Sequence, residues 1–237
     1  MKCSAERLIE ALIGIELARE RKAAQQIREQ RRKASYVVTI SRGLGTLGSE
    51  VCGALAERLG VDCCDRMILE EVARRADVDI ELVETLDENV KHLKIKPWEA
   101  IFKGKSYSKE RYLNHLVKVI LNLSQKGGVI LGRGAHLILG PDHAFRVRII
   151  GTLDVCARRV AEREKVDINT AKRRVETVNR ERTEYIHALY GANIRDCSDY
   201  DLVINSDRFS VGKMVDMILH AMVQAGYELT GEMLQTA

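Results

Sequence analysis

From residue 36 onward, short apolar runs alternate with longer stretches in which apolar residues recur at helical spacing. The short runs, such as YVVTI at 36–40, predict buried β-strands, and the longer stretches predict amphipathic helices. The predicted strands are residues 36–40, 60–64, 129–131, 145–150 and 201–204. The predicted helices are residues 49–59, 66–75, 80–92, 109–125, 155–165, 168–190 and 211–225.

This order of elements predicts the fold class. Parallel strands are joined by crossovers that are usually helices, so we expect an α/β fold with a three-layer arrangement, in which helices cover both faces of a parallel sheet. Residues 91–108 (KHLKIKPWEAIFKGKSYS) break the rhythm with Pro97, Trp98 and several lysines. We interpret that stretch as a surface insertion over a site.

The first 34 residues have a different pattern. An apolar stripe at roughly helical spacing is formed by Leu8, Ile9, Leu12, Ile13 and Ile15. The polar stretch 19–33 favours a solvated helix. We therefore expect an N-terminal helical extension over residues 1–34, packed on the core or on a second copy, and a homodimer through this helix is a hypothesis.

Composition narrows the class of protein. The chain has 237 residues, of which 46% are hydrophobic and 30% charged, as expected of a soluble globular protein. Charged residues near the start interrupt the apolar stretch that a signal peptide needs, and no run reaches the length of a membrane span. We expect a cytoplasmic protein without a membrane partner. The net charge of +4 does not demand a nucleic-acid surface, so no nucleic-acid partner is expected.

The six cysteines show no C-x-x-C spacing, which argues against a tetrahedral zinc site. Reduced thiols are the expectation for a cytosolic protein. The adjacent Cys63 and Cys64 lie in a predicted strand, where their side chains point to opposite faces. We interpret both as small buried hydrophobic residues.

The stretch ISRGLGTLGSE, residues 40–50, joins a predicted strand to a predicted helix and so forms a phosphate cradle. Its Gly43, Gly45 and Gly48 match the dinucleotide fingerprint G-x-G-x-x-G. Asp62 and Asp65 lie roughly where an acid would bind a ribose hydroxyl. The first interpretation is therefore a dinucleotide-dependent oxidoreductase.

The second interpretation is a P-loop, G-x-x-x-x-G-K-[ST], which has lost its lysine. Gly43 and Gly48 have the required spacing, but Ser49 and Glu50 follow. What remains is a run of N–H donors at a helix N-terminus, which favours an anion, with Arg42 beside it to contribute positive charge. We expect Glu50 to favour the helix N-terminus rather than to reach a metal ion.

Arginines elsewhere in the chain favour the second interpretation. The run VILGRG, 129–134, places Arg133 at the carboxyl edge of a predicted strand, where open α/β sheets bind ligands. Further arginines follow on the predicted helices 155–165 and 168–190, although interleaved acids indicate salt-bridged, solvated surfaces for most of them. Phosphoryl transfer, unlike hydride transfer, needs several cations around the transferred group.

From Tyr36 to about Met222 the sequence resembles the cytidylate kinase-like family, a branch of the P-loop nucleoside monophosphate kinases. The resemblance lies in ISRGLGTLGSEVCGALAERLG, CDRMILEEVA, GGVILGRGAHLIL, RVRIIGTLDVCARRVAERE and NRERTEYIHALYGANIRDCSDYDLVINSDRFSV. That family typically shows a loop like SREYGSGGREIA, with glycine where other P-loop kinases have lysine. The absent lysine is then a family trait.

The resemblance implies a P-loop kinase-like domain over residues 35–237 that uses ATP and Mg²⁺, with an acceptor-site insertion at about 66–125 and a lid at about 158–190. It implies Mg²⁺-dependent transfer of the ATP γ-phosphoryl group to a nucleoside monophosphate, with CMP or dCMP as the first candidate. The residues expected to line the ATP phosphates are Arg42, Gly43, Gly45, Thr46, Gly48 and Ser49. Asp65, Arg133 and Tyr185 would lie at the acceptor site, and Arg182 and Arg133 would stabilise the transferred charge.

Three positions depart from the family pattern. Leu47 stands where the family usually has glycine, Gly134 where true cytidylate kinases have aspartate, and Asn179 where an acid often precedes the lid arginine. These departures motivate an alternative, a nucleotide-binding regulatory module without kinase activity. His136 is expected to pack or to form a local hydrogen bond, and Ser206 and Asp207 are expected near the adenine.

Overall fold

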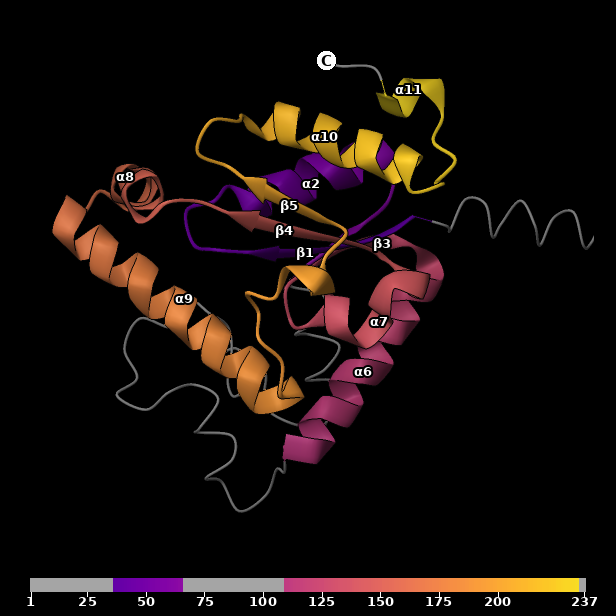
Figure 1. Cartoon of the computed structure of the whole chain (residues 1–237), viewed down its shortest axis with the longest axis horizontal. Coiled ribbons are helices and arrows are strands. Elements are labelled where there is room, and N and C mark those ends of the chain that lie inside the picture. The colour runs from indigo at the N-terminus through magenta and orange to yellow at the C-terminus, as the bar shows by residue number, and fades with distance from the viewer. Residues whose placement is uncertain (1–35, 66–108, 235–237) are drawn as a thin grey trace, which may run out of the picture. The chain divides into compact units, whose positions relative to one another are not determined.

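The computed structural model describes residues 36–65 and 109–234 (Figure 1). The predicted N-terminal extension, the helices predicted at 66–75 and 80–92, and the lysine-rich stretch 91–108 lie outside the described residues.

The described residues contain a five-stranded sheet in which all paired strands are parallel, as the sequence predicts. The strands are β1 (Val37–Arg42), β2 (Cys63–Cys64), β3 (Gly128–Leu131), β4 (Phe145–Ile150) and β5 (Leu202–Asn205). Their order across the sheet is β2-β3-β1-β4-β5. β1 is therefore the central strand. Its residues 37–40 are all buried, because a central parallel strand is covered on both faces. This burial explains the nearly unbroken apolar run in its sequence.

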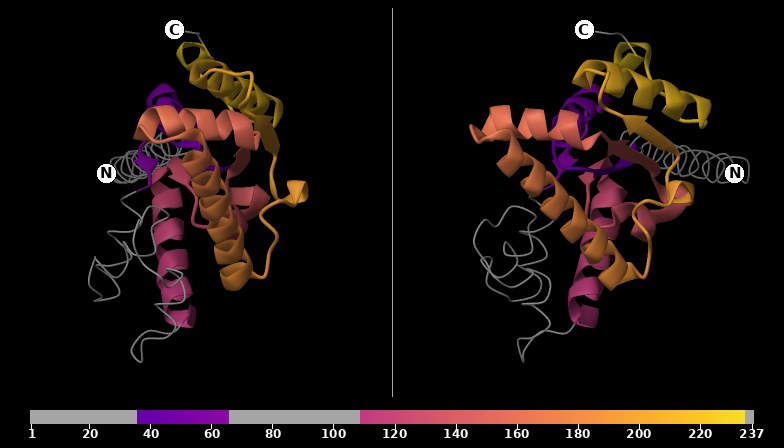
Figure 2. Two further views of the ribbon diagram at one scale, coloured as in Figure 1. Left: turned by 90° about the vertical axis from the view of Figure 1, so that its left-hand side faces the viewer. Right: turned by 60° about the vertical axis from the view of Figure 1, so that its left-hand side comes forward.

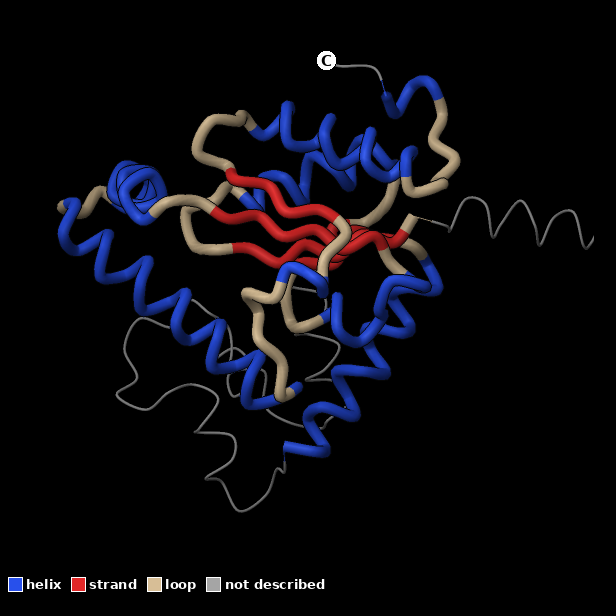
Figure 3. The backbone as a smooth tube through the Cα atoms, viewed as in Figure 1, coloured by secondary structure: helices blue, strands red, loops and turns tan. Residues whose placement is uncertain are grey.

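Helices cover both faces of the sheet (Figures 1 and 3). On one face lie α2 (Gly48–Leu59) and α10 (Val211–Gln224), with the short α11 (Gly231–Leu234) beyond them. On the other face lie α6 (Lys109–Lys126) and α7 (Ala135–His143). Two core clusters result, one containing Leu55 and Ile218 and the other containing Leu116 and Ile130. The three-layer prediction is confirmed.

A third pair of helices stands at the carboxyl end of β4. α8 (Leu153–Glu164) follows that strand directly, and α9 (Ile168–Tyr190) packs along α8 (Figure 2). Asp167 caps α9, because its side chain accepts hydrogen bonds from the N–H groups of Asn169 and Thr170, and Gly191 ends the helix at φ 66°. A small core between the two helices includes Leu44 from the loop after β1.

Two elements differ from the prediction. Only Cys63–Cys64 forms a strand within the predicted run 60–64, because Gly60 is the left-handed cap of α2. Helix α7 at Ala135–His143 was not predicted, because Gly140 and Pro141 stand within it. Gly140 has φ 64°, so the helix is kinked there, and Pro141 begins its last turn. A short 3-10 helix at Cys197–Asp199 precedes β5.

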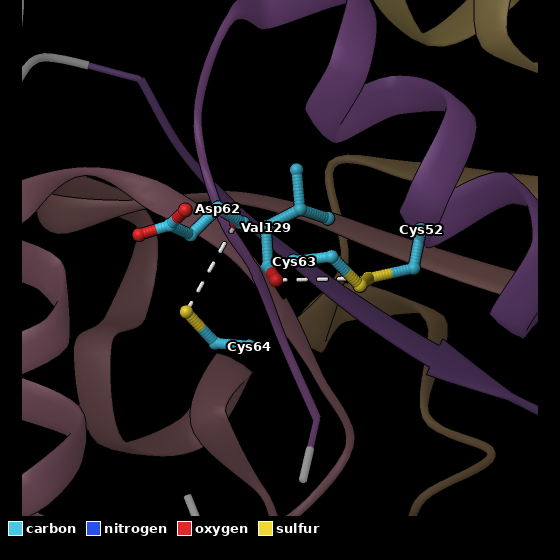
Figure 4. Close-up of a disulfide and its surroundings, with 5 residues drawn as sticks. All are labelled: Cys52, Asp62, Cys63, Cys64 and Val129. Carbon is cyan, nitrogen blue, oxygen red and sulfur yellow. Dashed lines mark hydrogen bonds between the residues drawn. A yellow bond between two sulfur atoms is a disulfide. The ribbon is translucent and has the colours of Figure 1, made fainter. Parts of the chain in front are cut away.

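The expectation for the cysteines is partly wrong. Cys52 of α2 and Cys63 of β2, eleven residues apart, form a disulfide (Figure 4). Cys63 is exposed, whereas Cys64 is buried, and burial raises the pKa of the Cys64 thiol. The two neighbours do face opposite ways, as strand geometry requires. No local spacing indicates this pair, because the tertiary fold brings the two sulfur atoms together.

Candidate active site

The loop after β1 is fixed at both sides. The N–H of Gly43 donates to the Ile149 carbonyl oxygen of β4 (3.2 Å), and the Thr46 hydroxyl donates to the Gly43 carbonyl oxygen (2.9 Å). The N–H of Leu44 donates to Oδ1 of Asn179 on α9 (2.9 Å). The loop is therefore held between the sheet and the long helix.

Two residues of this loop have left-handed backbone conformations. Gly45 has φ 79°, and a Cβ atom there would lie 2.5 Å from the Cys156 carbonyl oxygen, so the close approach of α8 requires glycine. Leu47 has φ 62° and is the N-cap of α2, a conformation that costs a non-glycine residue about 1–2 kcal/mol. Leu47 makes no side-chain capping bond, so the first-turn N–H groups of α2 are oriented for an anion.

A second left-handed segment follows β3. Gly132, Arg133 and Gly134 have φ values of 78°, 57° and 71°. A Cβ atom on Gly132 would lie 2.6 Å from Nη1 of Arg42, so this turn passes closely over the arginine that ends β1. Arg133 is only 6% exposed and its guanidinium lies 6.0 Å from the ring centroid of Tyr185. Strained backbone of this kind is typical of functional sites.

Arg182 on α9 completes the group. Its side chain is buried, and Nη1 donates to the Arg42 carbonyl oxygen (2.9 Å). Arg42, Arg133 and Arg182 line a small cavity of about 20 Å³ together with His136 and Tyr185. The structure thus brings together arginines from β1, from the turn after β3 and from α9.

A larger cavity of about 160 Å³ adjoins the loop. Arg42 and Arg182 line it as well, together with Arg148 of β4 and Arg195 from the segment after α9. The four arginines lie around one space, and no carboxylate is among its described lining residues. Several guanidinium groups around one space are typical of a site that binds a phosphate chain.

A hydrogen-bonded cluster lies beneath the larger cavity. The Arg148 guanidinium donates to Oγ of Ser41 (3.0 Å) and lies 5.5 Å from the ring centroid of Tyr200. The Tyr200 hydroxyl donates to the Ile194 carbonyl oxygen (3.0 Å) and lies 3.1 Å from Nε2 of His136. Burial, helped by nearby Arg148, lowers the pKa of His136 to about 4, so its ring is neutral near pH 7. His136 packs against Tyr200, as predicted.

Arg159 of α8 links the glycine loop to the segment after β5. Its guanidinium donates to the carbonyl oxygen of Gly45 (3.2 Å) and to both the hydroxyl (3.0 Å) and the carbonyl oxygen (2.8 Å) of Ser206. Asp207 accepts from the N–H of Thr152 (3.0 Å), just before α8. The predicted roles of Ser206 and Asp207 near adenine remain predictions, and both residues also stabilise the local backbone.

The predicted site residues do not all meet at one place. The cavities are lined by Arg42, Gly43, Thr46, Arg133, Arg182 and Tyr185. Gly48 and Ser49 begin α2 beside them. Asp65 follows β2 and is not among the lining residues of either cavity. Arg148 and Arg195 were missed, although arginine near the end of the apolar strand FRVRII is an unusual signal.

The strand order bears on the dinucleotide interpretation. In that fold the acid that binds the ribose follows the strand adjacent to β1. Here β3 lies beside β1, and β2 lies one strand further out. Asp62 and Asp65 are therefore displaced from the glycine loop by a whole strand, which argues against a ribose contact there.

The profile of the family described as "Cytidylate kinase-like family" matches residues 37–208. The chain belongs to the cytidylate kinase-like family. A cytidylate kinase from Methanothermobacter thermautotrophicus is 24% identical over 174 residues, which cover 73% of this chain and 96% of that protein. A cytidylate kinase from Methanopyrus kandleri is 34% identical over 97 residues, which cover 37% of this chain and 50% of that protein, so the chain spans only half of that relative's length.

A solved structure supports the fold. The crystal structure of an uncharacterized protein from Eubacterium ventriosum is similar with a TM-score of 0.60 and 26% sequence identity. The similarity covers 80% of this chain and 99% of that chain. The two proteins therefore share this fold over most of this chain.

Two family departures have a visible structural counterpart. Tyr190 donates from its hydroxyl to the Arg133 carbonyl oxygen (2.6 Å), and a Cβ atom on Gly134 would lie 2.3 Å from the Tyr190 ring. An aspartate at 134 therefore has no room while Tyr190 stays in place. Asn179, where the family often has an acid, accepts the Leu44 N–H as a carboxylate would.

Tyr185 lines the smaller cavity and belongs to a cluster of three tyrosines. The hydroxyls of Tyr112 and Tyr185 lie 3.0 Å apart, and Tyr190 packs in the same cluster. Burial raises the pKa of Tyr185 and of Tyr190, so both phenols stay neutral. They contribute hydrogen-bonding and aromatic surface around Arg133 rather than negative charge.

Within residues 36–65 and 109–234, no group of three or more histidine, cysteine, aspartate or glutamate side chains forms a metal site. No helix in those ranges is both long and apolar enough to cross a bilayer.

Proposed function

We propose that this protein transfers the γ-phosphoryl group of ATP to a nucleoside monophosphate, with CMP or dCMP as the first acceptor to test. The observation that carries the proposal is the pair of arginine-lined cavities, which share Arg42 and Arg182. The larger cavity is lined by the glycine loop and the smaller one by the GRG turn. A phosphoryl group passing between two nucleotides needs continuous positive charge of this kind.

The residues present fit the phosphates of ATP. The uncapped N-terminus of α2 offers N–H donors, and Arg42 flanks them. A bound Mg²⁺ would be held mainly by phosphate oxygens, with water completing its shell, and it would contribute further charge neutralisation. Glu50, exposed in the first turn of α2, is the carboxylate on that helix end and complements its dipole.

We assign different tasks to the two buried arginines. Arg133 would hold the acceptor phosphate, because its backbone turn and Tyr185 fix the guanidinium at the edge of β3. Arg182 would stabilise charge on the transferred group, because it reaches both cavities from α9. Both act by binding and orienting phosphate, and the buried neutral His136 is left without a proton-transfer task.

A second candidate is a nucleotide-binding regulatory module without kinase activity. It is favoured by the strained Leu47 in the loop and by the ring of Tyr190 against Gly134. Such a module binds ATP and does not consume it with any acceptor.

An ATP-consumption assay with Mg²⁺ and a panel of CMP, dCMP, UMP, AMP and GMP separates the two candidates. The kinase predicts turnover with one of these acceptors, and Arg133→Ala should raise the KM for that acceptor at least tenfold. Arg180→Ala is the matched control, because Arg180 is exposed on α9 and lines neither cavity. Saturable ATP binding without turnover across the whole panel would support the regulatory module instead.

A further inference from the structure

The loop of this protein carries no lysine between Gly43 and Glu50, yet the donor phosphates of a kinase need a cation beside the loop. Sequence alone offered Arg42 for this task. The neighbouring strand β4 contains a second cation, Arg148, which pairs in register with Ser41 of β1, two residues before Gly43. Arg148 therefore lies beside the end of β1, next to the start of the loop.

The environment of Arg148 differs from that of Arg146 on the same strand. Arg146 is neutralised by Asp201, because its Nη2 lies 2.7 Å from a carboxylate oxygen. Among the described residues, Arg148 instead contacts neutral groups, which are the Ser41 hydroxyl and the hydroxyl and ring of Tyr200. Within the described part of the chain it forms no ion pair.

A half-buried guanidinium without a counter-charge is expected where an anion binds. Ser41 and the aromatic face of Tyr200 use only part of its donor capacity, and the rest lines the larger cavity beside Gly43 and Thr46. Arg195 lies at the same cavity and is exposed. The contacts to Ser41 and Tyr200 orient Arg148, as supporting contacts do for a binding residue.

We propose that Arg148, with Arg195 beside it, binds the polyphosphate chain of the donor nucleotide and provides the positive charge that a loop lysine provides in other P-loop kinases. The identity of the anion as a donor polyphosphate rests on the proposed function. The presence of a polyphosphate site at Arg148 does not depend on which acceptor is used.

Calorimetric titration of the full-length protein with inorganic tripolyphosphate tests the proposal without any acceptor. Arg148→Met should weaken binding about 10- to 100-fold, because a charge-assisted hydrogen bond is lost. Arg148→Lys should recover part of the loss, since it restores the charge without the planar fork. Arg180→Met removes one charge from the exposed face of α9 and should change binding by less than twofold.

Arg148→Met could also bind less tripolyphosphate because it misfolds. Arg195→Met distinguishes this case, because Arg195 is exposed and its replacement should leave the packing intact. We expect about three- to tenfold weaker binding for that variant. Wild-type tripolyphosphate affinity in Arg148→Met would overturn the proposal, and so would a loss that Arg148→Lys does not relieve at all.

The polyphosphate site and the proposed kinase function can fail independently of each other. If Arg148→Met turns over ATP as the wild type does and binds tripolyphosphate normally, Arg148 is not a phosphate ligand and the kinase proposal stands. If tripolyphosphate binding depends on Arg148 while no nucleoside monophosphate is phosphorylated, the polyphosphate site stands and the acceptor assignment fails.

Discussion

Tyr190 donates a hydrogen bond to the carbonyl oxygen of Arg133 (2.6 Å), and its ring fills the space next to Gly134 in which a side chain would begin. The last turn of α9 is thereby joined to the turn that presents the buried Arg133. The position of this arginine depends on a contact between segments 57 residues apart in the sequence.

This contact predicts that Gly134→Ala is more destabilising than another glycine substitution at a similar φ. Gly191→Ala is the matched control, because Gly191 has φ 66° and open space at its Cβ position. Both variants should lose about 1–2 kcal/mol from the left-handed backbone, and Gly134→Ala should lose a further 1–3 kcal/mol, roughly, from overpacking. Urea unfolding measures the difference. Equal losses would mean that Tyr190 does not occupy this space in solution.

The buried His136 predicts a pH-dependent stability. Its pKa in the folded protein is lowered to about 4, by burial first and by the charges of Arg148 and Arg146 next. The unfolded chain, with an ordinary histidine pKa of about 6.5, binds the proton more readily. The contribution of neutral His136 to the free energy of unfolding is therefore fully present above about pH 6.5, and it is lost as the pH falls from about 6.5 towards 4.

His136→Gln removes this titration and keeps an amide that can bond Tyr200. Between pH 7 and pH 4 the wild type should lose on the order of 2 kcal/mol more unfolding free energy than the variant. Chemical denaturation at a series of pH values gives both curves. Parallel curves over that interval would show that the histidine is not buried and neutral.

The disulfide predicts a redox-dependent stability. It ties α2 to β2 across a short loop, and a cross-link of that length stabilises a folded chain by about 2–3 kcal/mol. A reducing agent should lower the unfolding free energy of the wild type by about that amount. Cys63→Ser should have the lower unfolding free energy both with and without the reducing agent. Cys197 is an exposed free cysteine, so the unfolding free energy of Cys197→Ser should still fall when the reducing agent is added. An unfolding curve of the wild type that does not shift under reduction would contradict the assignment.

Patterns within one element were readable from the sequence, and relations between elements were not. The apolar run of β1 was predicted because a central parallel strand is buried on both faces. β4 was predicted as well, although buried and half-buried residues alternate along it. Helix α7 was missed because Gly140 and Pro141 together indicate a loop in any local analysis. Local signals are sufficient to predict a regular strand or helix. The kinked α7 is stabilised by packing against other elements, which local signals do not contain.

The site shows the same division. Arg42 and Arg133 were predicted because each lies two residues after the end of a predicted strand and beside a glycine. The ring of Tyr190 against Gly134 was not predicted, because no spacing rule connects residues so far apart. Arg148 was assigned to a strand without regard to its charge. Only the register of β1 with β4 shows that it lies beside Ser41, just before the glycine loop.

The measurement that tests phosphoryl transfer most directly is product formation followed by ³¹P nuclear magnetic resonance. It would use ATP, Mg²⁺ and the accepted nucleoside monophosphate with wild-type protein, Arg182→Ala and Arg180→Ala. We predict equal amounts of ADP and nucleoside diphosphate with the wild type and Arg180→Ala. For Arg182→Ala we predict a kcat about 10²- to 10³-fold lower with a nearly unchanged KM for ATP, because charge stabilisation in the transition state is lost. Absence of any nucleoside diphosphate with the wild type, or equal losses in kcat and ATP affinity for Arg182→Ala, would contradict the account.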